Sequence, residues 1–89
     1  MENLRREIDV IDSEMTDLFI KRLETVEKIS EYKEENNLPV FDEKREAEKI
    51  KKAAENVREE YKSETEEFIK FLMDISKRRQ RRLRGENSK

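Results

Sequence analysis

Apolar residues in the first third of the chain recur at steps of three and four positions. Such steps place side chains on one face of a helix. No Gly or Pro interrupts residues 3–35. The pattern therefore predicts a helix over residues 3–36 that ends at Asn36-Asn37-Leu38-Pro39, with this apolar face: Leu4, Ile8, Ile11, Met15, Leu18, Val26 and Ile29.

A second helix is expected over residues 43–60. Asp42 is a suitable N-cap, and Glu43 favours the positive end of the helix dipole in the first turn. Its apolar face would consist of Ile50, Ala53, Ala54, Val57 and Tyr61.

A third helix is expected over residues 64–84. Ser63 followed three residues later by Glu66 has the pattern of a capping box. Gly85 is a stop signal, and residues 85–89 resemble a frayed tail. The apolar face of this helix would be Phe68, Ile69, Leu72, Met73 and Ile75.

The three helices predict an all-α fold in a single domain over residues 1–89. A helix of this length measures about 50 Å, whereas a compact domain of this size has a radius of gyration of about 13 Å. The first helix must therefore extend beyond its own fold. A second copy of the chain would cover the projecting apolar face, so we expect an intertwined homodimeric helical bundle.

The composition fits long helices, because 49% of residues are charged, 33% are hydrophobic, and there is one Gly and one Pro. High charge is also a signature of disorder, but a net charge of −2 and helical spacing favour a folded chain. No apolar run has the length of a membrane span and no signal peptide is apparent, so a cytoplasmic protein without membrane contact is expected.

The absence of Cys and His from the sequence excludes disulfides and thiolate metal sites and removes the commonest general base. Any chemistry must use Arg, Lys, carboxylates, Ser, Gln or Tyr. We therefore expect no metal site.

Polar residues interrupt the apolar faces of all three helices. Arg22 and Lys33 continue the face of the first helix, Glu46 that of the second, and Ser76 and Gln80 that of the third. Each has an ordinary explanation on its own, since long cations extend along the edges of apolar faces and Glu46 can pair with a lysine of its own helix. Together, because buried charge needs a partner, they favour a polar cavity filled by a ligand or by internal ion pairs.

Five short motifs contain these residues. They are Leu4-Arg5-x-x-Ile8-Asp9-x-Ile11-Asp12, Leu18-x-x-x-Arg22, Ile29-x-x-x-Lys33, Asp42-x-x-Arg45-Glu46 and Ser76-x-x-x-Gln80. In this order and at these separations, over about residues 4–83, the sequence resembles the all-helical class of chorismate mutases.

The resemblance implies that the protein converts chorismate to prephenate, a pericyclic rearrangement that needs no nucleophile, proton transfer or cofactor. It implies that Lys33 and Gln80 donate hydrogen bonds to the ether oxygen, and that Glu46 accepts one from the ring hydroxyl. Arg22, Lys33 and Arg45 would bind the two carboxylates of the substrate, together with Arg5 from the partner subunit. The full set of implied substrate contacts is Arg5, Arg22, Lys33, Asp42, Arg45, Glu46, Ser76 and Gln80.

The sequence departs from the family's pattern at Lys49 and Lys77, whose positions can be apolar in relatives, and in a heavy basic run over residues 77–84. One alternative is an isochorismate-pyruvate lyase on the same fold, although Glu46 favours the mutase. A helical interaction module would leave the inward polar residues unexplained. Nucleic-acid binding through the basic run is a third alternative, but net charge gives no reason for it, and such a run commonly complements the helix dipole.

Overall fold

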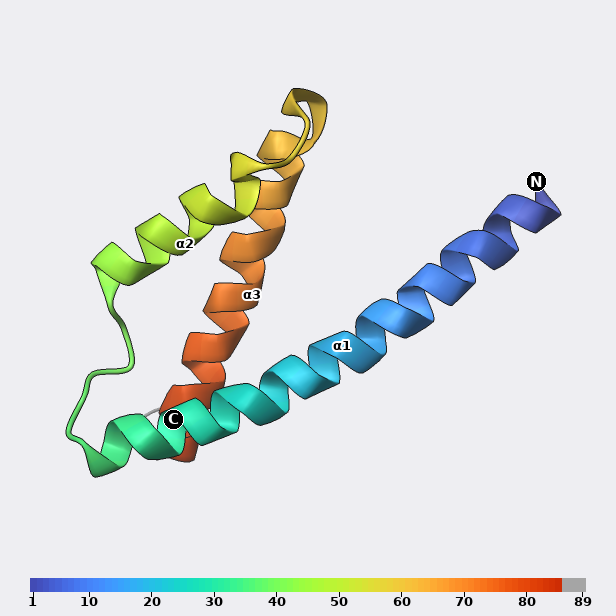
Figure 1. Ribbon diagram of the computed structural model, residues 1–89. Coiled ribbons are helices and arrows are strands. Elements are labelled where there is room, and N and C mark those ends of the chain that lie inside the picture. The colour runs from blue at the N-terminus through green and yellow to red at the C-terminus, as the bar shows by residue number, and fades with distance from the viewer. Residues whose placement is uncertain (86–89) are drawn as a thin grey trace.

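The computed structural model describes residues 1–85 and contains three α-helices and one short 3-10 helix, with no strand in that range (Figure 1). The helices are α1 (Glu2–Glu35), α2 (Glu43–Glu55), the 3-10 helix η1 (Glu59–Tyr61) and α3 (Lys62–Leu83). Helices α2 and α3 run antiparallel, and the second half of α1 lies against α3. The predicted all-α, three-helix architecture is confirmed.

Helix α1 ends at the predicted break by a defined backbone arrangement. Asn37 adopts a left-handed conformation with φ of 55°. Its amide donates to Glu34 O at 3.2 Å, and the amide of Leu38 donates to Lys33 O at 2.7 Å. This pair of bonds is a Schellman motif, which satisfies the last carbonyls of the helix.

Helix α2 begins as predicted and ends earlier than predicted. Asp42 is its N-cap, and Asp42 Oδ1 accepts from the Arg45 amide at 3.2 Å. The prediction that the helix continues to residue 60 is wrong: it ends at Glu55, Asn56 caps it, and Arg58 is extended with ψ of 146°. The chain must reverse here so that α3 can pack against α2. This tertiary requirement outweighs the helix propensity of the residues after Glu55.

The start of α3 also differs from the prediction. Ser63 lies inside the helix and is not its N-cap; Tyr61 occupies that position without a side-chain hydrogen bond. The reason is η1, whose Tyr61 amide bonds to Arg58 O at 2.9 Å and carries the chain directly into the first turn of α3. Helix α3 ends at Leu83, and Gly85 follows it with a left-handed φ of 78°, in agreement with the predicted stop signal. The remaining residues of the predicted tail, 86–89, lie outside the described residues.

The core is thin. Its buried apolar residues are Val26, Val40, Ala54 and Met73. The carboxylate of Glu27 on α1 also pairs with the guanidinium of Arg79 on α3, which ties the second half of α1 to α3. Arg79, Arg78 and Lys77, the first three residues of the basic run, all form ion pairs with carboxylates.

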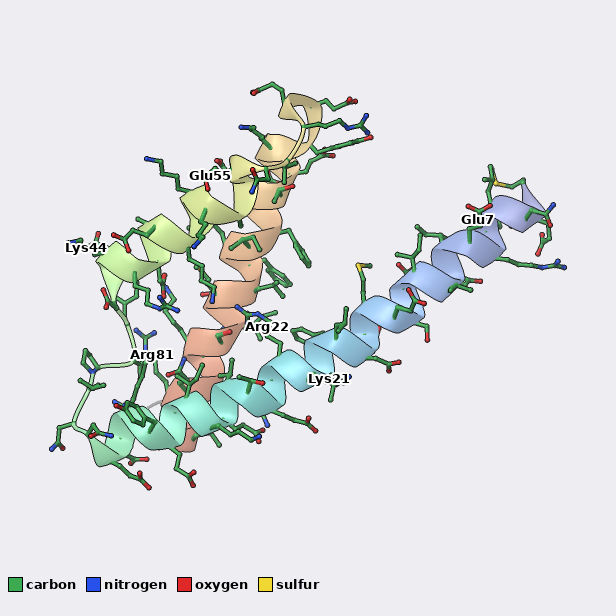
Figure 2. The ribbon with its side chains drawn as sticks, viewed as in Figure 1. Glu7, Lys21, Arg22, Lys44, Glu55 and Arg81 are labelled. Carbon is green, nitrogen blue, oxygen red and sulfur yellow. The ribbon has the colours of Figure 1, made fainter. Side chains whose placement is uncertain are left out.

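The first half of α1 extends away from the rest of the chain (Figure 2). Leu4 is 63% exposed and Leu18 is 64% exposed. The radius of gyration of 15.9 Å exceeds the value of about 13 Å typical of a compact domain of this size. The projecting apolar face is as expected, and its cover by a second copy stays a prediction. No helix within residues 1–85 combines the length and apolar character needed to cross a membrane.

Candidate active site

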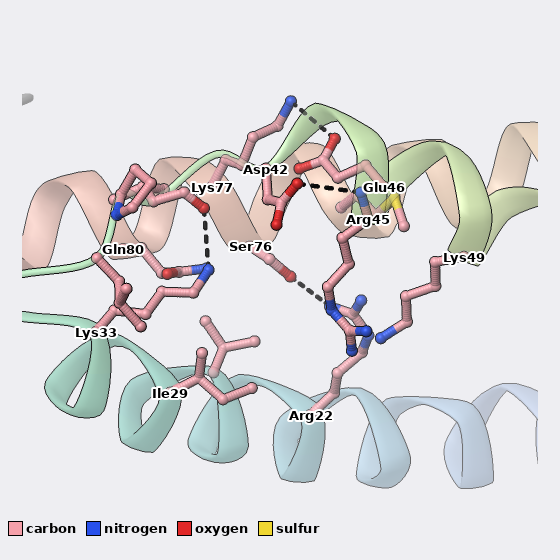
Figure 3. A pocket seen from close by; sticks show the side chains of 15 residues that line it. Arg22, Ile29, Lys33, Asp42, Arg45, Glu46, Lys49, Ser76, Lys77 and Gln80 are labelled. Atoms are coloured by element: carbon pink, nitrogen blue, oxygen red, sulfur yellow. Dashed lines mark hydrogen bonds and ion pairs between the residues drawn. The ribbon is translucent and has the colours of Figure 1, made fainter. Parts of the chain in front are cut away.

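A polar pocket of about 410 Å³ lies between α1, α2, α3 and the loop that joins α1 to α2 (Figure 3). Seven of the eight residues expected to contact substrate line it: Arg22, Lys33, Asp42, Arg45, Glu46, Ser76 and Gln80. The other lining residues are Val26, Ile29, Leu38, Pro39, Val40, Lys49, Met73 and Lys77. Residues from distant parts of the sequence therefore share one cavity.

Arg22 enters the pocket from α1 and contacts α3. Its Nη1 donates to Ser76 Oγ and, at 3.3 Å, to Leu72 O. Ser76 Oγ in turn donates to Leu72 O at 2.9 Å. Burial lowers the pKa of the Arg22 guanidinium, because it penalises the charged form. Both contacts use Nη1, so the other N–H donors of the guanidinium remain available.

Lys33 lies in the last turn of α1. Its Nζ donates to Val40 O in the α1–α2 loop at 3.0 Å. Burial lowers its pKa, and the positive charges of Arg84 and Arg45 lower it further, against the opposing effect of Asp42 and Glu46. An ammonium has three donors, so one bond to Val40 leaves others for a ligand.

Gln80 is buried in the wall of the pocket, with 5% of its surface exposed. Its Oε1 is buried and has no hydrogen-bond partner within residues 1–85. An unpaired buried polar atom is costly unless something satisfies it. A polar group of a ligand could serve that role here.

The first two turns of α2 supply the acidic groups of the pocket. Asp42 is held by its capping bond to Arg45. One turn on, Glu46 Oε1 lies 3.3 Å from the ammonium of Lys77 on α3. That ammonium also lies 4.4 Å from the centre of the Phe41 ring, a cation–π contact.

Lys49 lies one turn after Arg45 on α2 and faces Arg22 across the pocket. Burial lowers the pKa of Lys49, and repulsion from Arg45 and Arg22 lowers it further. The lining thus contains five cations and only two carboxylates. Such a site suits a small ligand with more than one negative charge.

Arg5 is the expected site residue that this chain does not bring to the pocket. It lies near the start of α1 and is exposed. At about 1.5 Å per residue, it is about 25 Å along the helix from Arg22. Its proposed role requires a second copy of the chain.

Sequence reasoning missed the contribution of the α1–α2 loop. Leu38, Pro39 and Val40 line the pocket, and the guanidinium of Arg84 holds the loop by donating to Leu38 O at 2.8 Å. No periodic pattern marks loop residues as pocket lining. The proline after the helix end was the one available signal that this segment has a restricted backbone.

Within residues 1–85, no group of three or more His, Cys, Asp or Glu side chains is arranged to hold a metal ion. The pocket instead combines guanidinium, ammonium, amide and hydroxyl donors. Groups of these kinds can bind and orient an anion and stabilise charge that develops on oxygen.

Fold and pocket together define an all-helical domain with a cation-rich pocket between its helices. The chain belongs to the family described as chorismate mutase type II, whose model matches residues 4–81. The resemblance carried by the five sequence motifs is thereby confirmed, and with it the assignment to a family of isomerases.

The chain is also similar to the T-protein of Haemophilus influenzae (strain ATCC 51907 / DSM 11121 / KW20 / Rd). The two are 41% identical over 46 residues, which cover 52% of this chain and 12% of the length of that protein. No solved structure matches the chain.

Proposed function

We propose that the protein rearranges chorismate to prephenate in this pocket. The observation that carries the proposal is the convergence of seven motif residues, from three helices, on one cation-rich cavity. Membership of the type II chorismate mutase family supports it. The proposed site of action is the cytoplasm, as inferred from the sequence.

The two carboxylates of chorismate pair with the cations of the pocket. Arg22 retains N–H donors beyond those used for Ser76 and Leu72, so it can bind a carboxylate without losing its support. Ser76 helps to seat the same group. Holding both ends of the substrate keeps the enolpyruvyl arm over the ring, and this orientation removes much of the entropic barrier.

Lys33 and Gln80 act at the breaking C–O bond, where negative charge grows on the ether oxygen. Lys33 donates to that oxygen while keeping its bond to Val40 O. The Gln80 amide donates from the buried side of the pocket. Donors fixed before the reaction stabilise the transition state without further reorganisation.

Glu46 accepts a hydrogen bond from the ring hydroxyl. Its Oε1 pairs with Lys77, and Oε2 remains available for a donor on the substrate. Asp42 lies on the same side, at the start of α2. A site built to accept a hydroxyl proton disfavours substrates that lack that group, because the acceptor is then left unpaired.

A second copy of the chain completes the proposed enzyme. An apolar groove adjoins the pocket at Arg22 and runs between α1 and α3, next to the exposed first half of α1. The first half of a partner's α1 would cover this groove and carry its Arg5 toward the pocket. The apolar residues of the groove are Met15, Leu18, Phe19, Phe68, Phe71, Leu72 and Ile75.

The direct test is to add purified protein to chorismate and follow the loss of chorismate absorbance together with the appearance of prephenate. Isochorismate is assayed in parallel. Conversion of chorismate is the expected result. Turnover of isochorismate alone, with release of pyruvate, would overturn the proposal in favour of the lyase.

A further inference from the structure

Three cations gather at one end of the pocket without a carboxylate among them. Arg45 and Lys49 come from neighbouring turns of α2, and Arg22 comes from α1; Figure 3 shows their side chains converging. In the part of the chain that the structure describes, no salt bridge joins any of the three to an acidic side chain. Burial lowers the pKa of Lys49, and repulsion from Arg45 and Arg22 lowers it further.

The other lysine of the pocket is in a different situation. Lys77 pairs with Glu46 and lies over the Phe41 ring, so its charge is already matched. Of the two lysines, only Lys49 therefore adds uncompensated positive charge to the site.

Gathering like charges at one end of a pocket is unfavourable unless an anion offsets them. A carboxylate between the three groups would accept hydrogen bonds from each and relieve their repulsion. A neutral ligand, or a ligand whose negative charge lies elsewhere, would not relieve the repulsion between the three cations.

We propose that Lys49 is a further substrate-binding residue, which forms with Arg22 and Arg45 a three-cation subsite for one carboxylate of the substrate. The inference rests on the proposed function, since it assigns a group of that substrate to this end of the pocket. Lys49 lies at the opposite end of the pocket from Lys33 and Gln80, the residues proposed to act on the ether oxygen (Figure 3). It therefore binds the carboxylate in the ground state and in the transition state alike and acts mainly on KM.

The test compares Lys49→Met with Lys52→Met. Both remove one positive charge from the same helix and keep a long unbranched side chain, but Lys52 lines none of the pockets described here and is exposed. For Lys49→Met we expect KM for chorismate to rise about threefold to tenfold with kcat little changed, the range for a partly exposed charge-assisted contact. Lys49→Arg should restore most of the affinity, and Lys52→Met should match the parent.

Rising salt should also weaken kcat/KM less in Lys49→Met than in the parent, because one screened contact has been removed. If Lys49→Met keeps the parent's KM and salt dependence, or if Lys52→Met changes KM equally, the proposal that Lys49 belongs to a carboxylate subsite is wrong.

A binding measurement separates this inference from the proposed function. Prephenate, a dicarboxylate, is added to parent and variants, and the rise in unfolding temperature is recorded. We expect a clear rise for the parent and Lys52→Met, and a smaller one for Lys49→Met. A parent that binds prephenate through Lys49 but does not convert chorismate would refute the mutase while keeping the subsite. An active parent whose prephenate response is unchanged in Lys49→Met would refute the subsite alone, and a parent with neither turnover nor binding would refute both.

Discussion

The ammonium of Lys77 lies 3.3 Å from Glu46 Oε1, so a residue of α3 orients a carboxylate of α2 at the wall of the pocket. The Phe41 ring lies against the same ammonium, at 4.4 Å from its centre, and restricts where it can move. With 23% of each side chain exposed, the pair contributes at most about 1 kcal/mol to stability. Its larger effect is to present the second oxygen of Glu46 in one place.

Replacing Glu46 should therefore lower activity without unfolding the protein. Glu46→Gln keeps the shape and loses the charge, so kcat/KM should fall; Glu46→Ala removes the acceptor entirely and should be worse. Steady-state kinetics measure the loss, and circular dichroism checks that the helices persist. Full activity of Glu46→Ala would mean that the residue is only a solvated partner of Lys77.

The dimer can be tested by complementation. Arg5 lies on the projecting half of α1 and Arg22 lies in the pocket of its own chain. Mixed dimers of Arg5→Ala and Arg22→Ala chains should regain part of the activity, because one of their two sites keeps both arginines. Each variant alone should be poorly active.

The control for this experiment is verified exchange of subunits, followed by mass spectrometry of the mixed dimers. No recovery after exchange would assign Arg5 to the site of its own chain. Sedimentation gives an independent check, since a folded and active monomer at micromolar concentration contradicts the proposed assembly.

Gln80 offers a test of the mechanism through pH. Gln80→Glu should gain activity as pH falls, because a protonated carboxyl can donate to the ether oxygen, whereas an ionised one donates nothing and repels the growing negative charge. Burial of position 80 raises the pKa of a carboxyl there, and the neighbouring cations lower it, so the direction of the profile is what is predicted. The measurement is kcat/KM between about pH 4.5 and 8, with circular dichroism at each pH.

The parent is the control for that series, and its profile should be nearly flat over the same range. Gln80→Ala, which loses one donor, should be slower by roughly 10²- to 10³-fold. If Gln80→Glu is as active as the parent at neutral pH and has the same flat profile, Gln80 does not donate to the ether oxygen.

At alkaline pH the activity of the parent should fall earlier than the ordinary lysine pKa of 10.5 would suggest. Lys33 is needed as an ammonium, and burial together with the charge of Arg84 lowers its pKa. Deprotonation therefore begins at lower pH and removes a donor from the ether oxygen. Lys33→Arg keeps its charge in this range, so whatever activity it retains should be less sensitive to alkali; equal alkaline losses in both proteins would point to another group.

The sequence by itself determined the helical elements and most of the candidate site. Helical apolar spacing without an intervening Gly or Pro, together with good helix formers, specifies the long α1. Asn37 and Gly85 can adopt the left-handed backbone that follows a helix end. Inward polar residues such as Arg22 and Gln80 could be recognised because each one interrupts an apolar face. The spacing of side chains along a single helix is enough to reveal such an interruption.

Tertiary structure alone decided which partners these residues have. Glu46 has suitable lysines on its own helix, yet it pairs with Lys77 of α3, because α3 packs antiparallel to α2 at that level. The same packing ends α2 at Glu55 instead of residue 60 and makes η1, not Ser63, lead into α3. Contacts between residues some 30 to 50 positions apart depend on how the helices cross, and side-chain period along one helix carries no information about that crossing.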